Sequence, residues 1–256
     1  MAEPGGLRLL PGGAVGGPEG GFEVGYIAED GTDRRIALRD AGQTRFEWSR
    51  PARRFPQYKG QKHMPGRWWT ATMGCHVGYE SWLERDHLML LDFDPAVVAV
   101  ASQPFWLFWT NDQGKVRSHA PDYFARLAAG GAVVVDCRPA ERIMPRDAAA
   151  FAATRLACEQ LGWGYRVSGA PEPTSTRNIR WLSGYRHPRH DLPAVAAVLR
   201  QVFNQPGGLM AGAEAAGDPI SVLPVLFHLL WRHELRADLS MPLHPDTVVM
   251  TEEVTG

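Results

Sequence analysis

The apolar residues of this chain recur with two different periods, which separate strand-like stretches from helix-like ones. Short runs of alternating or continuous apolar residues, bounded by turn residues, predict strands at residues 22–27, 35–38, 97–101, 105–110, 115–126, 132–137 and 164–167, and an extended segment at 247–250. Longer stretches of good helix formers predict helices at residues 79–91, 146–161, 176–185, 193–203 and 220–235. A helix, several strands, a helix and a further strand describe an α/β sheet that helices cover on both faces.

Composition shifts along the chain indicate three parts. Glycine and proline are dense in residues 1–21, which we expect to form a flexible tail. We expect the α/β domain to span residues 22–190 and a C-terminal helical domain to span residues 191–256. Short helices that lead into an extended segment are compatible with a small winged-helix unit in this second domain.

The overall composition indicates a globular protein, because 45% of its 256 residues are hydrophobic. The net charge of -1 does not indicate a general polyanion-binding protein, so a DNA-handling protein of this composition must concentrate its positive charge on one face. Cys75, Cys137 and Cys158 fit neither a disulfide framework nor the spacing of a zinc site. With no secretion signal and no apolar run near the ~18 residues of a membrane span, we expect a cytoplasmic protein without a membrane partner.

Residues 50–70 carry basic side chains, no acidic ones, and several aromatic rings. Phosphates attract such cations, and bases or sugars pack on such rings, so this segment is a candidate contact for double-stranded DNA. The candidate DNA-binding residues are Arg53, Arg54, Lys59, Lys62 and Arg67. A solvated basic loop is the alternative interpretation.

Two carboxylates are predicted to meet at the open end of a β-hairpin. If residues 128–131 form the turn, Asp122 lies roughly opposite Asp136 on the next strand. Arg138 is two residues after Asp136, so both side chains point to the same face of the sheet. Like charges this close cost free energy unless a divalent cation lies between them, so the pattern favours a metal site. The alternative is a satisfied turn carboxylate beside an ion pair of Asp136 with Arg138.

A third oxygen ligand is expected from the predicted helix at residues 79–91. Glu84 shares a face with Leu88 and Leu91, whose burial turns it toward the sheet, and a half-buried carboxylate needs a partner. Glu80 lies on the same predicted face, and we interpret it as a first-turn carboxylate that favours the helix dipole. His119 is interpreted as a surface or structural group.

The acidic helix residue, the pair Pro121-Asp122 and the sequence Asp136-x-Arg138 together resemble the PD-(D/E)XK nuclease pattern. Wider segments are similar to TnsA-like endonuclease subunits of heteromeric transposases, most of all to their actinobacterial branch. These segments are SWLERDHLMLLDFDP at 81–95, SQPF at 102–105, HAPDYF at 119–124, and Gly162-Trp163 with Tyr165. The resemblance covers roughly residues 50–190, and the chain from Asp191 to about Val249 resembles the helical C-terminal part of those proteins.

The resemblance implies a restriction-endonuclease-like mixed sheet flanked by helices and a Mg²⁺-dependent DNA endonuclease, with Mn²⁺ as a substitute. The implied metal ligands are Glu84, Asp122, Asp136 and the Cys137 carbonyl oxygen, and the implied catalytic residues are Glu84, Asp122, Asp136 and Arg138. In the family, this subunit cuts the 5′ ends of a mobile element, and a separate integrase-fold transposase cuts the 3′ ends. An ATPase regulator contacts the C-terminal region.

The chain departs from the family pattern at Arg138, where lysine is usual, and at Asp136, where glutamate or glutamine is usual. Arginine cannot lose its proton at neutral pH, so Arg138 can stabilise phosphate charge but cannot act as a base. A catalytically silent DNA-binding or assembly module and a restriction or defence nuclease therefore stand as alternatives to a transposition endonuclease.

Overall fold

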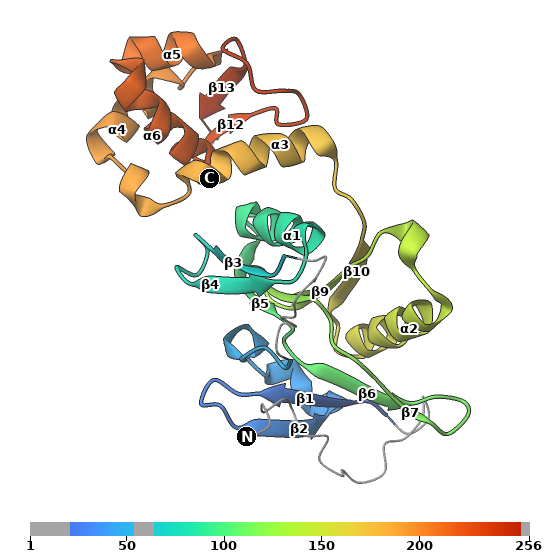
Figure 1. Ribbon diagram of the computed structural model, residues 1–256. Helices are drawn as coiled ribbons and strands as arrows, with labels where there is room; N and C mark the ends of the chain where they lie inside the picture. The colour runs from blue at the N-terminus through green and yellow to red at the C-terminus, as the bar shows by residue number, and fades with distance from the viewer. Residues whose placement is uncertain (1–20, 54–63, 252–256) are drawn as a thin grey trace. The chain divides into compact units, whose positions relative to one another are not determined.

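The computed structural model describes residues 21–53 and 64–251 of the chain (Figure 1). Over these residues the protein is mixed α/β and divides into two compact units. The first unit contains the described residues up to Leu91 together with Ala96–Ala170, and the second contains Asp92–Pro95 together with the residues from Pro171 onward. The flexible tail predicted at residues 1–21 lies, but for Gly21, outside the described residues.

The first unit contains two four-stranded sheets and a two-stranded hairpin, where the sequence predicted one sheet. Its strands are β1 (Glu23–Ile27), β2 (Asp33–Ala37), β3 (Gly66–Trp69), β4 (His76–Tyr79), β5 (Val97–Ser102), β6 (Trp106–Thr110), β7 (Val116–His119), β8 (Tyr123–Leu127), β9 (Ala132–Cys137) and β10 (Gly164–Ser168). Its helical segments are η1 (Leu38–Gln43), η2 (Phe46–Trp48), α1 (Trp82–Phe93, which ends in the second unit), η3 (Ala140–Arg142) and α2 (Pro145–Gln160). The sheet orders are β2-β1-β6-β7 and β10-β9-β8-β5.

The sheet β10-β9-β8-β5 is covered on both faces, as the apolar continuity of its strands predicts. Strand β9 pairs antiparallel with β8 and parallel with β10. On one face Tyr123 and Val135 pack with Leu88 of α1 in one apolar cluster. On the other face Phe124 and Val134 belong to a second cluster that includes residues of α2 and of the sheet β2-β1-β6-β7. Side chains of β8 and β9 therefore pack into an apolar cluster on each face of the sheet.

The strand predicted at residues 115–126 is two strands, because β7 and β8 belong to different sheets. The break falls at Ala120-Pro121-Asp122. Proline lacks the N–H group that a strand interior needs, so it marks the point where the chain leaves one ladder and enters the next. The break places Asp122 immediately before β8, at the end of the sheet.

The β8–β9 hairpin has the predicted register. Its turn contains Gly130 and Gly131, whose φ angles of 89° and 75° lie in the left-handed region that suits glycine. Tyr123 pairs with Val135, and the next step along the ladder brings the positions of Asp122 and Asp136 opposite each other. The prediction that these two residues share the open end of the hairpin is confirmed.

The β3–β4 hairpin was not predicted, because Gly66, Gly74 and Gly78 interrupt the apolar pattern. Gly66 pairs with Tyr79, and a Cβ atom at position 66 would lie 2.3 Å from the Tyr79 hydroxyl oxygen. A larger residue at position 66 would therefore displace the end of the Tyr79 side chain, and the glycine hides the strand from a periodicity argument.

The second unit is helical with a small sheet. Its elements are α3 (Pro173–Leu182), η4 (Ser183–Tyr185), η5 (Pro188–His190), α4 (Pro193–Val202), β11 (Gly207–Gly208), α5 (Leu209–Ala216), α6 (Pro219–Trp231), β12 (Leu235–Ala237) and β13 (Val248–Thr251). The strands form a sheet of order β11-β13-β12. The predicted helix at residues 220–235 ends early, because His233 takes a positive φ of 59° and leads the chain into β12.

The predicted domain boundary at residue 190 differs from the unit boundary, which falls between Ala170 and Pro171. The reason is that α3 packs within the second unit. The ring centroids of Trp181 and Phe227 of α6 lie 6.0 Å apart, and the Asn178 amide donates hydrogen bonds to the carbonyl oxygens of Leu239 and Met241. In the part of the chain that the structure describes, no helix combines the length and apolar character needed to cross a bilayer.

Candidate active site

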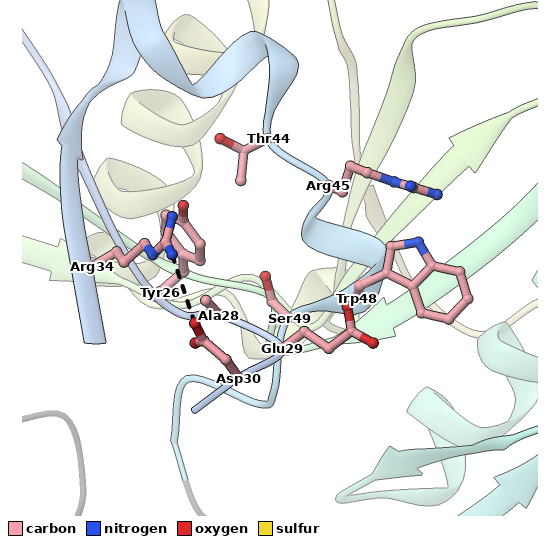
Figure 2. A pocket seen from close by; sticks show the side chains of 9 residues that line it. All are labelled: Tyr26, Ala28, Glu29, Asp30, Arg34, Thr44, Arg45, Trp48 and Ser49. Atoms are coloured by element: carbon pink, nitrogen blue, oxygen red, sulfur yellow. Dashed lines mark ion pairs between the residues drawn. The ribbon is translucent and has the colours of Figure 1, made fainter. Parts of the chain in front are cut away.

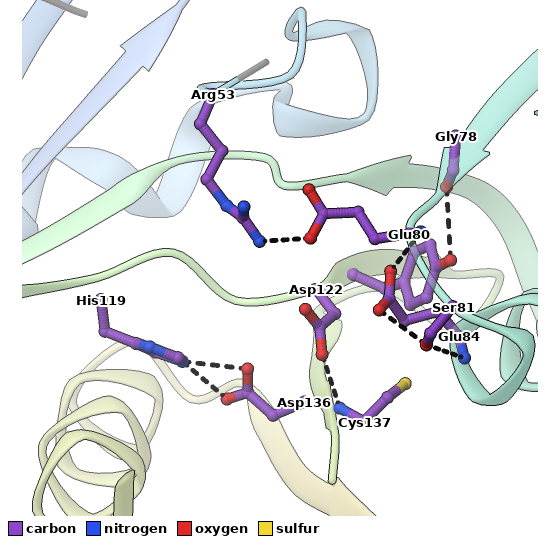
Figure 3. A network of polar contacts seen from close by, with 10 residues as sticks. Arg53, Gly78, Glu80, Ser81, Glu84, His119, Asp122, Asp136 and Cys137 are labelled. Atoms are coloured by element: carbon purple, nitrogen blue, oxygen red, sulfur yellow. Dashed lines mark hydrogen bonds and ion pairs between the residues drawn. The ribbon is translucent and has the colours of Figure 1, made fainter. Parts of the chain in front are cut away.

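A pocket of about 560 Å³ opens where the β8–β9 hairpin ends. All four residues predicted to be catalytic line it, namely Glu84, Asp122, Asp136 and Arg138. Cys137, whose carbonyl oxygen was a predicted ligand, lines it as well. Segments distant in sequence thus bring the predicted residues together, and Figure 3 shows four of the five, namely Glu84, Asp122, Asp136 and Cys137.

Asp122 lies between the other two predicted carboxylates. Its Oδ2 accepts a hydrogen bond from the Cys137 backbone N–H at 2.7 Å, which ties the start of β8 to the end of β9 (Figure 3). Burial raises the pKa of Asp122 well above its ordinary value, and the nearby charges of Glu84 and Asp136 raise it further. A buried carboxylate in such surroundings favours either a proton or a cation.

Asp136 is 2% exposed, and protein groups hold both of its oxygens. His119 Nε2 lies 2.9 Å from Oδ1 and 3.0 Å from Oδ2, and the Tyr165 hydroxyl donates to Oδ2 at 2.6 Å. Burial and the Asp136 charge raise the pKa of Tyr165, so its hydroxyl remains a donor. The sequence did not reveal these two partners, because His119 lies on β7 of the other sheet and Tyr165 on β10.

Glu84 caps the helix that carries it. Its Oε1 accepts from the Ser81 hydroxyl at 2.8 Å, its Oε2 accepts from the Glu80 N–H at 2.7 Å, and its own N–H donates to Ser81 Oγ at 3.2 Å. This is close to a capping box, and the spacing Ser81-x-x-Glu84 was its signature in the sequence. Burial raises the pKa of Glu84, and the Glu80 charge adds to that shift.

Glu80 precedes the helix instead of lying on its first turn, since α1 begins at Trp82. Its Oε2 forms an ion pair with Arg53 Nη2 at 2.8 Å (Figure 3). Its Oε1 is buried and has no hydrogen-bond partner among residues 21–53 and 64–251. Arg53, predicted to bind DNA, lines the pocket as the ion-pair partner of this carboxylate.

The remaining basic candidates are distributed over several places. Arg138 is exposed just after β9, and its N–H donates to the Ser168 carbonyl oxygen at 2.9 Å. Arg142 of η3 lines the same pocket as Arg138. Arg67 is exposed on β3 and lines a separate cavity of about 250 Å³. Arg54, Lys59 and Lys62 lie outside the described residues.

The pocket's donors fit a hard divalent cation by their chemistry. Mg²⁺ and Mn²⁺ prefer carboxylate, carbonyl and water oxygens, and the buried Glu80 Oε1 is an oxygen without a donor in the described chain. Within the described residues, however, no group of three or more His, Cys, Asp or Glu side chains is arranged to hold a metal ion. His119 and Tyr165 contact the oxygens of Asp136, and the helix cap contacts those of Glu84.

A larger cavity of about 600 Å³ lies beside β1 and β2, and none of the predicted site residues lines it (Figure 2). A carboxylate–guanidinium pair in this cavity joins Asp30 to Arg34 at 3.8 Å, and both side chains are largely exposed. Exposed pairs of this kind contribute little to stability or binding. Size alone therefore does not single out this cavity as a functional site.

Comparison of the chain with protein-family models and with curated proteins gave no match. The assignment of a function therefore depends on the residues of the pocket and on their arrangement.

Proposed function

We propose that this chain is a Mg²⁺-dependent DNA endonuclease that hydrolyses phosphodiester bonds. The observation that carries the proposal is the convergence of Glu84, Asp122, Asp136 and Arg138 on one pocket. They come from α1, the start of β8 and the end of β9, the same placement that the resemblance to PD-(D/E)XK nucleases implies. Chance proximity of an unrelated acidic helix residue, a Pro-Asp pair and an Asp-x-Arg sequence is a weaker explanation.

The arrangement around the pocket supports a restriction-endonuclease-like fold for the first unit. The mixed sheet β10-β9-β8-β5 has α1 against one face and α2 in the cluster on the other. In the second unit, helices α4 to α6 with a three-stranded sheet are compatible with a winged-helix-like domain.

Glu84, Asp122, Asp136 and the Cys137 carbonyl oxygen are the groups that would hold Mg²⁺. When bound, the ion would lower the pKa of a water molecule and offset charge on the scissile phosphate. His119 and Tyr165 orient Asp136 through hydrogen bonds to its oxygens. Because arginine side chains are protonated at neutral pH, Arg138 would stabilise negative charge on the phosphate and would not remove a proton.

The proposed substrate is double-stranded DNA at the 5′ ends of a mobile element, in a TnsA-like transposition system. An integrase-fold transposase and an ATPase regulator are the proposed partners, and Mn²⁺ is expected to replace Mg²⁺. The guanidinium groups of Arg138 and Arg142 at the pocket supply cations for the DNA phosphates.

A catalytically silent DNA-binding or assembly module is the second candidate. The observation that favours it is the complete engagement of Asp136 by His119 and Tyr165, together with arginine at position 138. Such a module binds DNA without a divalent ion and cleaves nothing.

Cleavage of duplex DNA in Mg²⁺ or Mn²⁺, by the chain alone and with an integrase-fold transposase from the same genome, separates the two candidates. Asp122→Ala should reduce the cleavage rate by about 100-fold or more. Removal of a residue that only hydrogen-bonds to a metal ligand already costs about 10–100-fold in metal affinity or activity. Asp238→Ala is the control, because Asp238 accepts hydrogen bonds from Ser240 in the second unit and does not line the pocket. Equal cleavage by wild type and Asp122→Ala excludes the proposed site, whereas metal-independent binding without cleavage by either protein favours the silent module.

A further inference from the structure

An exposed indole ring lies at the candidate active site. Trp82, the first residue of α1, lines the pocket together with Asp122 and Asp136, and it is 51% exposed. Tryptophan is a large side chain that folding normally buries to a great extent. The exposure of this ring beside carboxylates and guanidinium groups is a feature of the pocket that metal binding does not explain.

The other two aromatic side chains that line the pocket, among the residues that the structure describes, have structural contacts. Phe151 of α2 is 8% exposed, and its ring packs edge-on against the His119 ring with the centroids 5.6 Å apart. Trp106 is partly buried, and its Nε1–H donates a hydrogen bond to the Ala52 carbonyl oxygen at 3.2 Å. Of these three rings, Trp82 is therefore the one most accessible to a ligand.

Neighbouring side chains hold the indole ring in place. The guanidinium carbon of Arg85, which follows Trp82 by three residues on α1, lies over the ring at 4.3 Å from its centroid. The same guanidinium forms an ion pair with Asp86 at 2.7 Å, and the Tyr79 ring lies 6.5 Å from the indole, centroid to centroid. A cation over an aromatic face is attracted to it, so the exposed part of the ring is a preorganised flat apolar surface.

The charges of the pocket indicate which kind of molecule fits this surface. Arg53, Arg138 and Arg142 line the same pocket, and the divalent cation of the proposed function adds further positive charge there. The ligand that matches this combination has both anionic phosphates and a flat apolar face, and a nucleotide of a DNA strand has both. Bases stack on aromatic side chains largely without regard to sequence, because every base has a π-face.

We propose that Trp82 stacks on a nucleobase next to the scissile phosphate and thereby sets which phosphate of the strand enters the pocket. This inference rests on the proposed function, because it concerns the DNA substrate of the same pocket. A base that stacks on a protein ring has left the duplex stack, and unpaired bases do so at the lowest cost. The pocket therefore binds a strand with accessible bases more tightly than a strand without bases.

Fluorescence anisotropy with the full-length chain tests this preference in Ca²⁺, which prefers the same oxygen ligands as Mg²⁺. The probes are a labelled single-stranded oligothymidylate and a labelled abasic strand of the same length. Wild type should bind the oligothymidylate about tenfold or more tightly than the abasic strand. Trp82→Ala should bind both strands alike, and Trp82→Phe should keep most of the preference, because a phenyl ring also stacks on bases.

Trp48→Ala is the matched control. Trp48 is 43% exposed and has the Arg45 guanidinium carbon 5.7 Å from the centroid of its ring, but it does not line the pocket. This variant should keep the wild-type preference for the strand that carries bases. If Trp82→Ala does not fold, Trp82→Leu takes its place, since leucine is an apolar helix former without a ring.

The outcomes separate the inference from the proposed function. The wild-type preference in Trp82→Ala, or an equal loss of preference in Trp82→Ala and Trp48→Ala, overturns the role of Trp82 and leaves the nuclease proposal standing. The same holds if wild type binds duplex DNA but does not distinguish the two single strands. Absence of binding by wild type to the single strands and to duplex DNA overturns both.

Discussion

The two units of this protein differ in whether their buried polar side chains have hydrogen-bond partners. In the second unit, Asn178 is bonded to backbone groups through both ends of its amide, and His228 Nδ1 lies 2.7 Å from the Tyr185 carbonyl oxygen. Over residues 21–53 and 64–251, the buried side-chain atoms without a hydrogen-bond partner belong to Glu80 and Gln103, both in the first unit. Satisfied groups stabilise a fold, whereas unsatisfied ones lower its stability unless a water molecule, an ion or a ligand binds them.

The difference coincides with the position of the candidate site. Glu80 lines the pocket, and the backbone N–H of Gln103 donates to the Asp122 carbonyl oxygen at 2.8 Å. Gln103 also has a φ of 46°, which is unusual for a residue other than glycine. The residues with orphaned side-chain atoms therefore line the pocket or contact Asp122, which associates this loss of stability with the candidate site.

The largest expected effect concerns the satisfied unit. Asn178→Ala removes the hydrogen bonds that the Asn178 amide donates to the carbonyl oxygens of Leu239 and Met241. It also removes the hydrogen bond that the amide oxygen accepts from the Leu243 N–H, so these three backbone groups lose their partner. The free energy of unfolding should fall by about 2–4 kcal/mol. Urea denaturation measures it, and a loss below about 0.5 kcal/mol would show that these bonds do not stabilise the unit as the comparison requires.

The second-largest expected effect is an increase in the free energy of unfolding, and it concerns the first unit. Gln103→Leu keeps a similar volume at a side chain that is 1% exposed, and removes an amide with no partner in the described residues. The free energy of unfolding should rise by about 1 kcal/mol, because an apolar group of similar shape carries no desolvation penalty. A decrease in the denaturation midpoint would mean that the Gln103 amide is satisfied, and the contrast between the units would then weaken.

The smallest expected effect concerns an exposed carboxylate of the second unit that accepts hydrogen bonds from backbone N–H groups. Glu172 caps α3 by accepting from the Thr174 and Ser175 N–H groups, which lowers its pKa. A lowered folded pKa means that the stabilisation is present above the ordinary value of 4.5 and is lost as the pH falls through the folded pKa. The difference in melting temperature between wild type and Glu172→Gln should therefore vanish in acid, and a pH-independent difference would contradict this account.

Much of the first unit follows from local pattern. The buried strand at residues 132–137 and the helix at residues 79–91 stand out by apolar continuity and by helix-forming composition, and the structure places both within a few residues of the prediction. The turn at Gly130-Gly131 then fixes the register that sets Asp122 opposite Asp136. These features depend on residues close together in the chain, so a single sequence reveals them.

The remaining features depend on contacts between distant segments. His119 reaches Asp136 only because β7 leaves one sheet at Pro121 and the chain enters another. No local pattern announces the Arg53–Glu80 ion pair either. The Ser81-x-x-Glu84 cap is the exception, since its signature is local and the spacing of these two residues alone indicates a capping task for Glu84.

The central claim is that the pocket at the end of β8 and β9 binds a divalent cation, and crystals soaked in Mn²⁺ test it most directly through anomalous scattering. The account predicts a peak in this pocket with a carboxylate oxygen of Asp122 within about 2.0–2.6 Å. Well-ordered carboxylates with no peak among them, or a peak bound only by residues outside the pocket, would contradict it.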